Sequence, residues 1–271
     1  MTWTQQTSRH EATDAVMAES PEVPFEGQDA PFREIAGDRR EIVLIADHAS
    51  RYIPREYDDL GLDERDLSRH VAYDIGTERL TELLAASLKA PAVLSHFSRL
   101  LIDPNRGLDD PTLVMRLSDG AIVPGNAHVN AAERARRIAR FYTPYNEAVT
   151  DLLDRLTDAG RPAVFSIHSF TPVWKGAPRP WDVGVMWDGD DRLARALIAA
   201  LEEPGDVVVG ANEPYDGRMA GSTIDRHTRA RGLPTIGLEV RNDHLRDEAG
   251  IRAWAERLAP AFTRAANEVL R

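Results

Sequence analysis

Three short apolar segments of this chain each end on a side chain suited to acid–base or metal chemistry. The first, residues 42–46 with the sequence IVLIA, runs directly into Asp47 and His48. Five consecutive apolar residues predict a strand buried on both faces, because an amphipathic helix would interrupt the run with a polar residue by the fourth position. Ligands in open α/β sheets gather beyond the carboxyl ends of strands, so His48 lies where catalytic groups lie.

A lone histidine in this position is more often an ordinary hydrogen-bonded residue than a ligand. Here, however, two further apolar segments also end on a histidine or a glutamate. Residues 163–168 form a second apolar segment that ends on His168, and residues 235–240 form a third that contains Glu239. Two imidazoles and one carboxylate at three strand ends are the components of a hydrolytic zinc site. The imidazoles bind the metal, and the carboxylate takes a proton from water.

Composition limits which partners and which chemistry are available. The 271 residues include no cysteine, which excludes thiolate metal ligands, a cysteine nucleophile and disulfides. A formal net charge of -11 argues against a broad phosphate-binding surface and so against nucleic acid as a partner. The longest apolar runs have about five residues, against roughly 20 needed to span a bilayer, so no membrane partner is expected. We expect a cytoplasmic protein with a small anionic partner; association into a homo-oligomer is left open.

The domain organisation predicted is one domain preceded by an arm. Residues 1–40 have little periodic apolar pattern, which predicts an N-terminal arm that is partly disordered or packed on the surface, and no secretory signal. Residues 41–271 contain no Gly/Ser/Pro-rich linker and are expected to form a single catalytic α/β domain. Further strands are predicted at 92–95, 99–102, 183–187 and 207–209, and helices at 74–89, 130–156 with a kink at Pro144, 193–201 and 251–269.

Two polar stretches between these elements have both a structural and a functional interpretation. Asp74 lies near the start of a predicted helix, where it could be the N-cap or a metal ligand, and local sequence does not separate the two roles. Residues 103–107, with the sequence DPNRG, have the composition of a sharp turn. The same turn presents Asn105 and Arg106 together, and an amide beside a guanidinium fork is suited to binding a carboxylate.

Five blocks of the sequence, taken in order, resemble the N-formylglutamate amidohydrolase family. They are residues 47–54 (DHASRYIP), 70–76 (HVAYDIG), 98–106 (SRLLIDPNR), 166–172 (SIHSFTP) and 238–243 (LEVRND). That family is similar to the zinc carboxypeptidase and aspartoacylase group. The resemblance implies a phosphorylase/hydrolase-like α/β fold, with a central mixed, largely parallel sheet flanked by helices. It also implies one catalytic Zn²⁺ per chain, with another divalent metal as the alternative.

The resemblance assigns His48 and His168 as metal ligands. In the wider group the first histidine belongs to a His-x-x-Glu motif whose glutamate is also a ligand, whereas the third residue after His48 is Arg51. We therefore assign the third ligand to Asp74, the nearest carboxylate in a matching block, and keep His70 as the reserve candidate.

Substrate and catalytic roles follow from the same resemblance. Asn105 and Arg106 match the pair that holds the substrate carboxylate. Arg99 matches the arginine that polarises the scissile carbonyl, and Glu239 matches the catalytic base. Further predicted substrate contacts are Arg241 and Ser169.

These features predict a metal-dependent amidohydrolase that removes a formyl or small acyl group from an N-acyl acidic amino acid. The reaction expected is N-formyl-L-glutamate and water to formate and L-glutamate. The alternatives are another zinc N-acyl-amino-acid deacylase or carboxypeptidase, and a metal- or metabolite-binding protein without turnover. A serine hydrolase that uses Ser50 or Ser169 is disfavoured, because neither serine lies in a Gly-x-Ser-x-Gly elbow.

Overall fold

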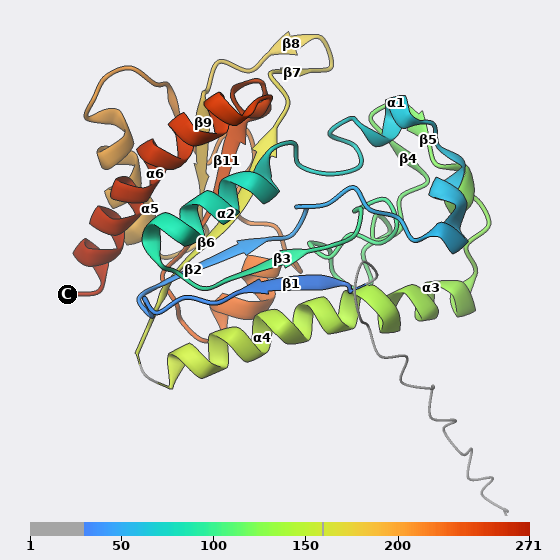
Figure 1. Cartoon of the computed structure of the whole chain (residues 1–271), viewed down its shortest axis with the longest axis horizontal. Helices are drawn as coiled ribbons and strands as arrows, with labels where there is room; N and C mark the ends of the chain where they lie inside the picture. Colours follow the sequence, from blue (N-terminus) through green and yellow to red (C-terminus); the bar gives the residue numbers. More distant parts are fainter. Residues whose placement is uncertain (1–29, 159) are drawn as a thin grey trace, which may run out of the picture.

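The computed structural model describes residues 30–158 and 160–271. Its centre is a seven-stranded sheet of order β1-β3-β2-β6-β11-β9-β10 (Figure 1). The strands are β1 Phe32–Ile35, β2 Ile42–Ala46, β3 Ala92–Ser95, β6 Ala163–Phe170, β9 Val183–Met186, β10 Val209–Ala211 and β11 Thr235–Arg241. Strands β3, β2, β6 and β11 are parallel, so their carboxyl ends meet at one edge, while β1 and β9 join antiparallel. The predicted fold class, a mixed and largely parallel sheet, is confirmed.

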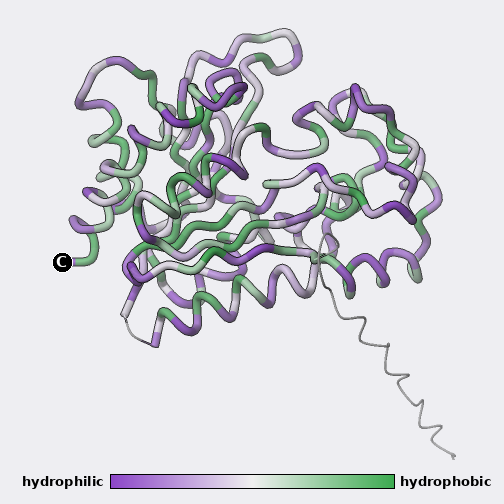
Figure 2. The backbone as a smooth tube through the Cα atoms, viewed as in Figure 1, coloured by the Kyte–Doolittle hydropathy of each residue, from purple (hydrophilic) through white to green (hydrophobic). Residues whose placement is uncertain are grey.

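Helices cover both faces of this sheet (Figure 1). Helices α2 (Thr77–Leu88), α5 (Arg192–Glu202) and α6 (Glu248–Val269) share one apolar core with the sheet, and α4 (Thr143–Thr157) shares the other. Figure 2 shows the apolar residues concentrated along the strands and on the inner sides of the helices. Because both faces are covered, strands such as β2 and β6 are apolar and buried along their whole length.

The remaining elements are short and lie mostly around the carboxyl edge of the sheet. They are η2 (Arg55–Gly61), α1 (Glu64–Leu67), the hairpin of β4 (Leu117–Ser118) and β5 (Ala121–Ile122), η3 (Pro124–Asn126), α3 (Ala131–Arg137), η4 (Ile138–Tyr142), the hairpin of β7 (Val173–Trp174) and β8 (Ala177–Pro178), η5 (Asp225–Arg229) and η6 (Asn242–Leu245). No helix in the described part of the chain combines the length and apolar character needed to cross a bilayer.

The helix predicted over 130–156 begins as expected, because the Asn130 side chain accepts a hydrogen bond from the Glu133 backbone N–H. The break comes earlier than Pro144, at the π-helical segment η4, and Pro144 lies in the first turn of α4, where a proline is tolerated.

Two strand predictions were inaccurate. Residues 99–101 form a turn, in which the Leu101 N–H donates to the Ser98 carbonyl. Leu100, Leu101 and Ile102 are buried, and burial of a short apolar run does not require a strand. Strand β10 begins at Val209, two residues later than predicted. Of the predicted arm, residues 1–29 lie outside the described residues, and Phe32–Ile35 form β1 at the edge of the sheet.

Candidate active site

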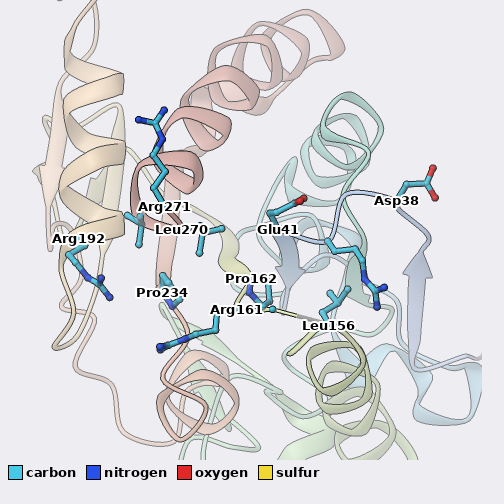
Figure 3. A pocket seen from close by; sticks show the side chains of 12 residues that line it. Asp38, Glu41, Leu156, Arg161, Pro162, Arg192, Pro234, Leu270 and Arg271 are labelled. Carbon is cyan, nitrogen blue, oxygen red and sulfur yellow. The ribbon is translucent and has the colours of Figure 1, made fainter. Parts of the chain in front are cut away.

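Two cavities lie at the two ends of the parallel strands. The larger, of about 610 Å³, is at the amino edge, where Glu41, Pro162 and Pro234 precede three strands (Figure 3). Its lining, taken from the described residues, contains no histidine. The smaller, of about 250 Å³, is lined by residues that include His48, His70, Asp74, Arg99, Asn105, Arg106, His168, Ser169, Trp174, Tyr215, Met219 and Glu239. This second cavity therefore holds the groups that can perform chemistry.

Strand alternation brings the functional side chains to one face of the sheet. Val164 of β6 packs in the core on the α4 side, so His168, four residues later, lies on that same face. In β11, Ile236, Leu238 and Val240 pack on the opposite side, which leaves Glu239 on the face of His168. Glu239 and His168 are also direct neighbours in the pairing of β11 with β6.

A buried group of three side chains offers metal ligands at this face. Ligand atoms of His48, Asp74 and His168 all lie within 4.8 Å of one another. The Asp74 Oδ2 atom is 2.9 Å from the His168 Nδ1 and 3.4 Å from the His48 Nδ1. Two imidazole nitrogens and one carboxylate oxygen are a typical donor set of catalytic zinc sites. The His48 Nδ1 is buried without a hydrogen-bond partner among the described residues, as expected of an atom reserved for a ligand.

The contacts of Asp74 separate its two predicted roles. The N-cap residue of α2 is Gly76, and no side chain caps that helix. The Asp74 carboxylate is instead turned toward the histidines, and it also accepts a hydrogen bond from the Ser169 backbone N–H. The reserve candidate, His70, has its Nδ1 3.4 Å from the Asp74 Oδ1 and lies outside the three-residue group.

Two further carboxylates contact the far nitrogens of these histidines. The His48 Nε2 lies 2.8 Å from the Asp103 Oδ1, and the His168 Nε2 lies 3.4 Å from the Asp47 Oδ2. A carboxylate that accepts the Nε2–H fixes the tautomer in which Nδ1 carries the free electron pair. Burial would raise the pKa of Asp47, but its contacts with His168 and His48 outweigh burial and lower that pKa to about 2. Burial would likewise raise the pKa of Asp103, but the charges of His48 and Arg99 hold that pKa well below its usual value. Both carboxylates behind the two histidines are thus anionic at neutral pH.

Glu239 is buried and has one oxygen, Oε2, without a hydrogen-bond partner in the described chain. Burial raises the pKa of Glu239 to about 8, although the positive charge of His168 opposes this shift. Glu239 forms no ion pair among the described residues, and Arg241, two residues later in β11, pairs with Asp182 and Asp243. Gly237 precedes Glu239 by two residues in β11 and lies on the same face of the strand. A Cβ on Gly237 would lie 2.7 Å from the methyl carbon of Met186, so the space beside this glycine is occupied.

Comparison with known proteins places this geometry in a family. Residues 40–246 match the family model described as N-formylglutamate amidohydrolase. The chain belongs to the N-formylglutamate amidohydrolase family. The N-formylglutamate deformylase of Pseudomonas aeruginosa is 25% identical over 203 residues, which are 69% of this chain and 76% of that protein.

Two solved structures resemble this member of the N-formylglutamate amidohydrolase family along nearly its whole length. A gene product of Agrobacterium tumefaciens is 31% identical, with a TM-score of 0.85 over 90% of this chain and 98% of that one. The N-formylglutamate amidohydrolase of Ralstonia eutropha is 21% identical, with a TM-score of 0.71 over 88% of this chain and 97% of that one, and shares the fold.

The arginines of this family member fall into different environments. Arg99 lines the cavity, and its guanidinium is 3.4 Å from the Asp74 Oδ1 and 3.0 Å from the Asp103 Oδ2, which leaves its buried Nε without a partner in the described chain. Arg106 has no carboxylate partner among the described residues; its NH1 donates to the Asn105 carbonyl and its Nε to the Thr112 hydroxyl.

Two other predicted substrate contacts have different outcomes. Ser169 lines the cavity, with its hydroxyl donating to the Ile75 carbonyl. Arg241 is not among the residues that line the cavity, because its guanidinium turns toward Asp182, Asp243 and the His244 ring. Arg241 does not reach the cavity in this structure, and its contact with substrate stays a prediction.

The sequence interpretation left several residues of this family member without a role. Asp47 and Asp103 stood in the matching blocks, but their function depends on which histidine each one contacts. Asp47 also accepts hydrogen bonds from the Tyr145 and Thr223 hydroxyls, each 2.7 Å away, so both residues help to hold the site. The signal that was available for both aspartates is their position just after a buried segment.

The loop that carries Tyr215 reaches the cavity because β9 has a glycine opposite Glu239. A Cβ on Gly184 would lie 2.1 Å from the Glu213 carbonyl oxygen, so only glycine lets this loop pack so close. Tyr215 and Met219 then form part of the cavity wall. Trp174 from the β7–β8 hairpin also lines the cavity.

Proposed function

We propose that this protein hydrolyses N-formyl-L-glutamate to formate and L-glutamate with the help of one Zn²⁺ or similar divalent ion. The observation that carries the proposal is the buried His48, Asp74 and His168 group directly beside Glu239. The relative from P. aeruginosa, named as an N-formylglutamate deformylase, supports this substrate. Arg106, a cation without a carboxylate partner in the described chain, supports an anionic ligand.

His48, His168 and Asp74 would hold the metal through two nitrogens and one oxygen, and their chemistry fits Zn²⁺. A bound divalent ion would supply Lewis acidity, which lowers the pKa of a water molecule and polarises the formyl carbonyl. Asp103 and Asp47 orient the two imidazoles from behind through their Nε2 atoms.

Glu239 is proposed to take the proton of the attacking water and to return it to the departing amine nitrogen. Its Oε2 has no other partner among the described residues, and burial raises its pKa above its usual value, toward the range in which a general base works best. Arg99 is proposed to donate from Nε to the developing oxyanion, since its other nitrogens are occupied by Asp74 and Asp103.

Asn105 and Arg106 are proposed to hold a substrate carboxylate. Asn105 is fixed at both ends, because its side-chain oxygen accepts from the Thr223 N–H and its backbone N–H donates to Asp103. The amide orientation that results leaves the Nδ2 group available as a donor beside the Arg106 guanidinium.

A substrate screen of metal-loaded protein tests the proposal. Release of free amino acid is followed for the N-formyl, N-acetyl and N-succinyl derivatives of glutamate, aspartate and leucine. We expect the highest kcat/KM for N-formyl-L-glutamate. A preference for another acyl group would identify a different deacylase, and binding without release would identify a protein that only binds metabolites.

Arg106→Ala should mainly raise KM. Loss of one partner from a buried charge pair costs at least about 2 kcal/mol, so KM for N-formyl-L-glutamate should rise by about 30-fold while kcat changes little. Steady-state kinetics measures both values. Arg116→Ala, at an exposed arginine outside the cavity, is the matched control and should behave like wild type. A fall in kcat at unchanged KM would show that Arg106 acts in the chemical step.

Asp103→Asn should weaken metal binding. The substitution keeps the size of the side chain but removes the anion that accepts the His48 Nε2–H, and such changes typically cost about 10–100-fold in metal affinity. Competition with a chromophoric chelator measures the dissociation constant. Asp109→Asn, at an exposed aspartate of the same loop, provides the control. Unchanged affinity in a folded Asp103→Asn protein would contradict the role given to Asp103.

A further inference from the structure

One buried arginine near the candidate site forms no ion pair with a carboxylate among the described residues. Among the described residues two arginines are less than a tenth exposed, Arg137 at 2% and Arg179 at 9%. Arg137 pairs with Glu133 at 2.8 Å. Arg179 has no carboxylate within ion-pair distance anywhere in the described chain. Because burying a cation without an anion is unfavourable, this arrangement suggests that a ligand provides the missing negative charge.

Arg179 is not itself among the residues that line the cavity, but it packs directly behind two aromatic residues that do. Its Cζ lies 5.2 Å from the ring centre of Trp174 and 5.0 Å from that of Tyr215, and both rings line the cavity. Phe170 supplies a third ring at 5.6 Å. The guanidinium is therefore packed among aromatic rings, which fix its plane. A guanidinium fixed in this way can donate two parallel hydrogen bonds to a carboxylate.

The hydrogen bonds of Arg179 leave part of its fork unused. All of them come from NH1, which donates to the Tyr215 hydroxyl at 3.1 Å and to the carbonyl and hydroxyl oxygens of Thr171. Its Nε and NH2 atoms make no hydrogen bond within the described residues. Since a guanidinium has five N–H donors, several remain for a ligand.

The charge balance of the cavity points to a ligand with two carboxylates. Arg99 is already neutralised by Asp74 and Asp103, whereas Arg106 and Arg179 lack carboxylate partners among the residues described. Arg106 follows β3 and Arg179 precedes β9, so they approach from opposite sides of β2, β6 and β11 in the strand order. Two separated cations match two carboxylates on one small molecule better than a single carboxylate.

We propose that Arg179 binds the substrate carboxylate that the Asn105 and Arg106 pair does not take, and so selects dicarboxylic N-acyl amino acids. As a substrate subsite, this assignment rests on the proposed function. The alternative is that Arg179 has only a structural role, in which its hydrogen bonds hold the β7–β8 hairpin against the loop of Tyr215.

Binding of simple acids tests the subsite without requiring turnover. Affinities of glutarate and butyrate for metal-loaded protein are measured by calorimetry in wild type, Arg179→Met and Arg179→Lys. We expect wild type to bind glutarate at least about 10-fold more tightly than butyrate, as a charge-assisted hydrogen bond would give. Arg179→Met, which keeps a long apolar stem between the rings, should lose this preference without weakening butyrate binding. Arg179→Lys should keep part of it.

Kinetics then connects the subsite to the reaction. Arg179→Met should raise KM for N-formyl-L-glutamate by about 10-fold and change KM for N-formyl-L-glutamine by less than about 2-fold. An equal rise in KM for both substrates, or an equal weakening of glutarate and butyrate binding, would show that Arg179 only holds the hairpin and the loop together. Either result would overturn the subsite. If wild type hydrolyses neither substrate but its glutarate preference depends on Arg179, the proposed reaction fails and the carboxylate site stands.

Discussion

Glu239→Gln should lower kcat by at least about 10²-fold, because a general base typically contributes 10²–10⁴-fold to the rate. The amide keeps the shape of the buried side chain and cannot accept the proton of the attacking water. Glu239 forms no ion pair among the described residues, so its loss should leave the fold intact. Steady-state kinetics on N-formyl-L-glutamate gives kcat, while metal content and melting temperature should stay near wild type.

The control for this substitution is Glu202→Gln, at an exposed glutamate at the end of α5 that should tolerate the change. Wild-type turnover by Glu239→Gln would show that another group accepts the proton. A loss of activity accompanied by unfolding or by loss of metal would assign Glu239 a structural role.

Replacing both His48 and His168 with alanine should abolish stable metal binding and, with it, turnover. Imidazoles supply most of the affinity of a site that has no thiolate ligand, and Asp74 alone would leave a single carboxylate. Wild-type protein purified with zinc present should contain close to one ion per chain by elemental analysis. The double variant should contain only a small fraction of that amount.

The matched control is His128→Ala, at an exposed histidine, which should retain full metal content. Single substitutions Asp74→Ala and His70→Ala then identify the third ligand. We expect the first to lose metal and the second to retain it, because Asp74 completes the buried three-residue group and His70 does not. Full metal occupancy in the His48 and His168 double variant would contradict the site.

The strand ends were predictable from sequence because their signals are local. Five apolar residues before Asp47 required a buried strand, and alternation in β11 placed Glu239 opposite Ile236 and Leu238. Parallel strands bring such ends to one edge whatever the intervening loops do. For this reason, His48, His168 and Glu239 could be chosen as candidates for one site from the sequence, and the structure shows that they converge.

Contacts made by loops could not be predicted in the same way. The pairing of Asp103 with His48 joins positions 55 residues apart. It depends on the turn that precedes Asp103, where the apolar residues had predicted a strand. Arg241 was expected to contact substrate because it stands in a matching block, yet its guanidinium pairs with Asp182 and Asp243 outside the cavity. Arg179 became notable only when its burial and lack of a carboxylate partner were visible in three dimensions.

Metal-dependent formate release is the most direct test of the proposed site. Chelator-treated protein is titrated with Zn²⁺ while formate and glutamate are measured from N-formyl-L-glutamate. We expect activity to rise linearly and to level off near about one ion per chain, with formate and glutamate released in equal amounts. Full turnover by protein stripped of nearly all its metal would contradict the role assigned to His48, Asp74 and His168.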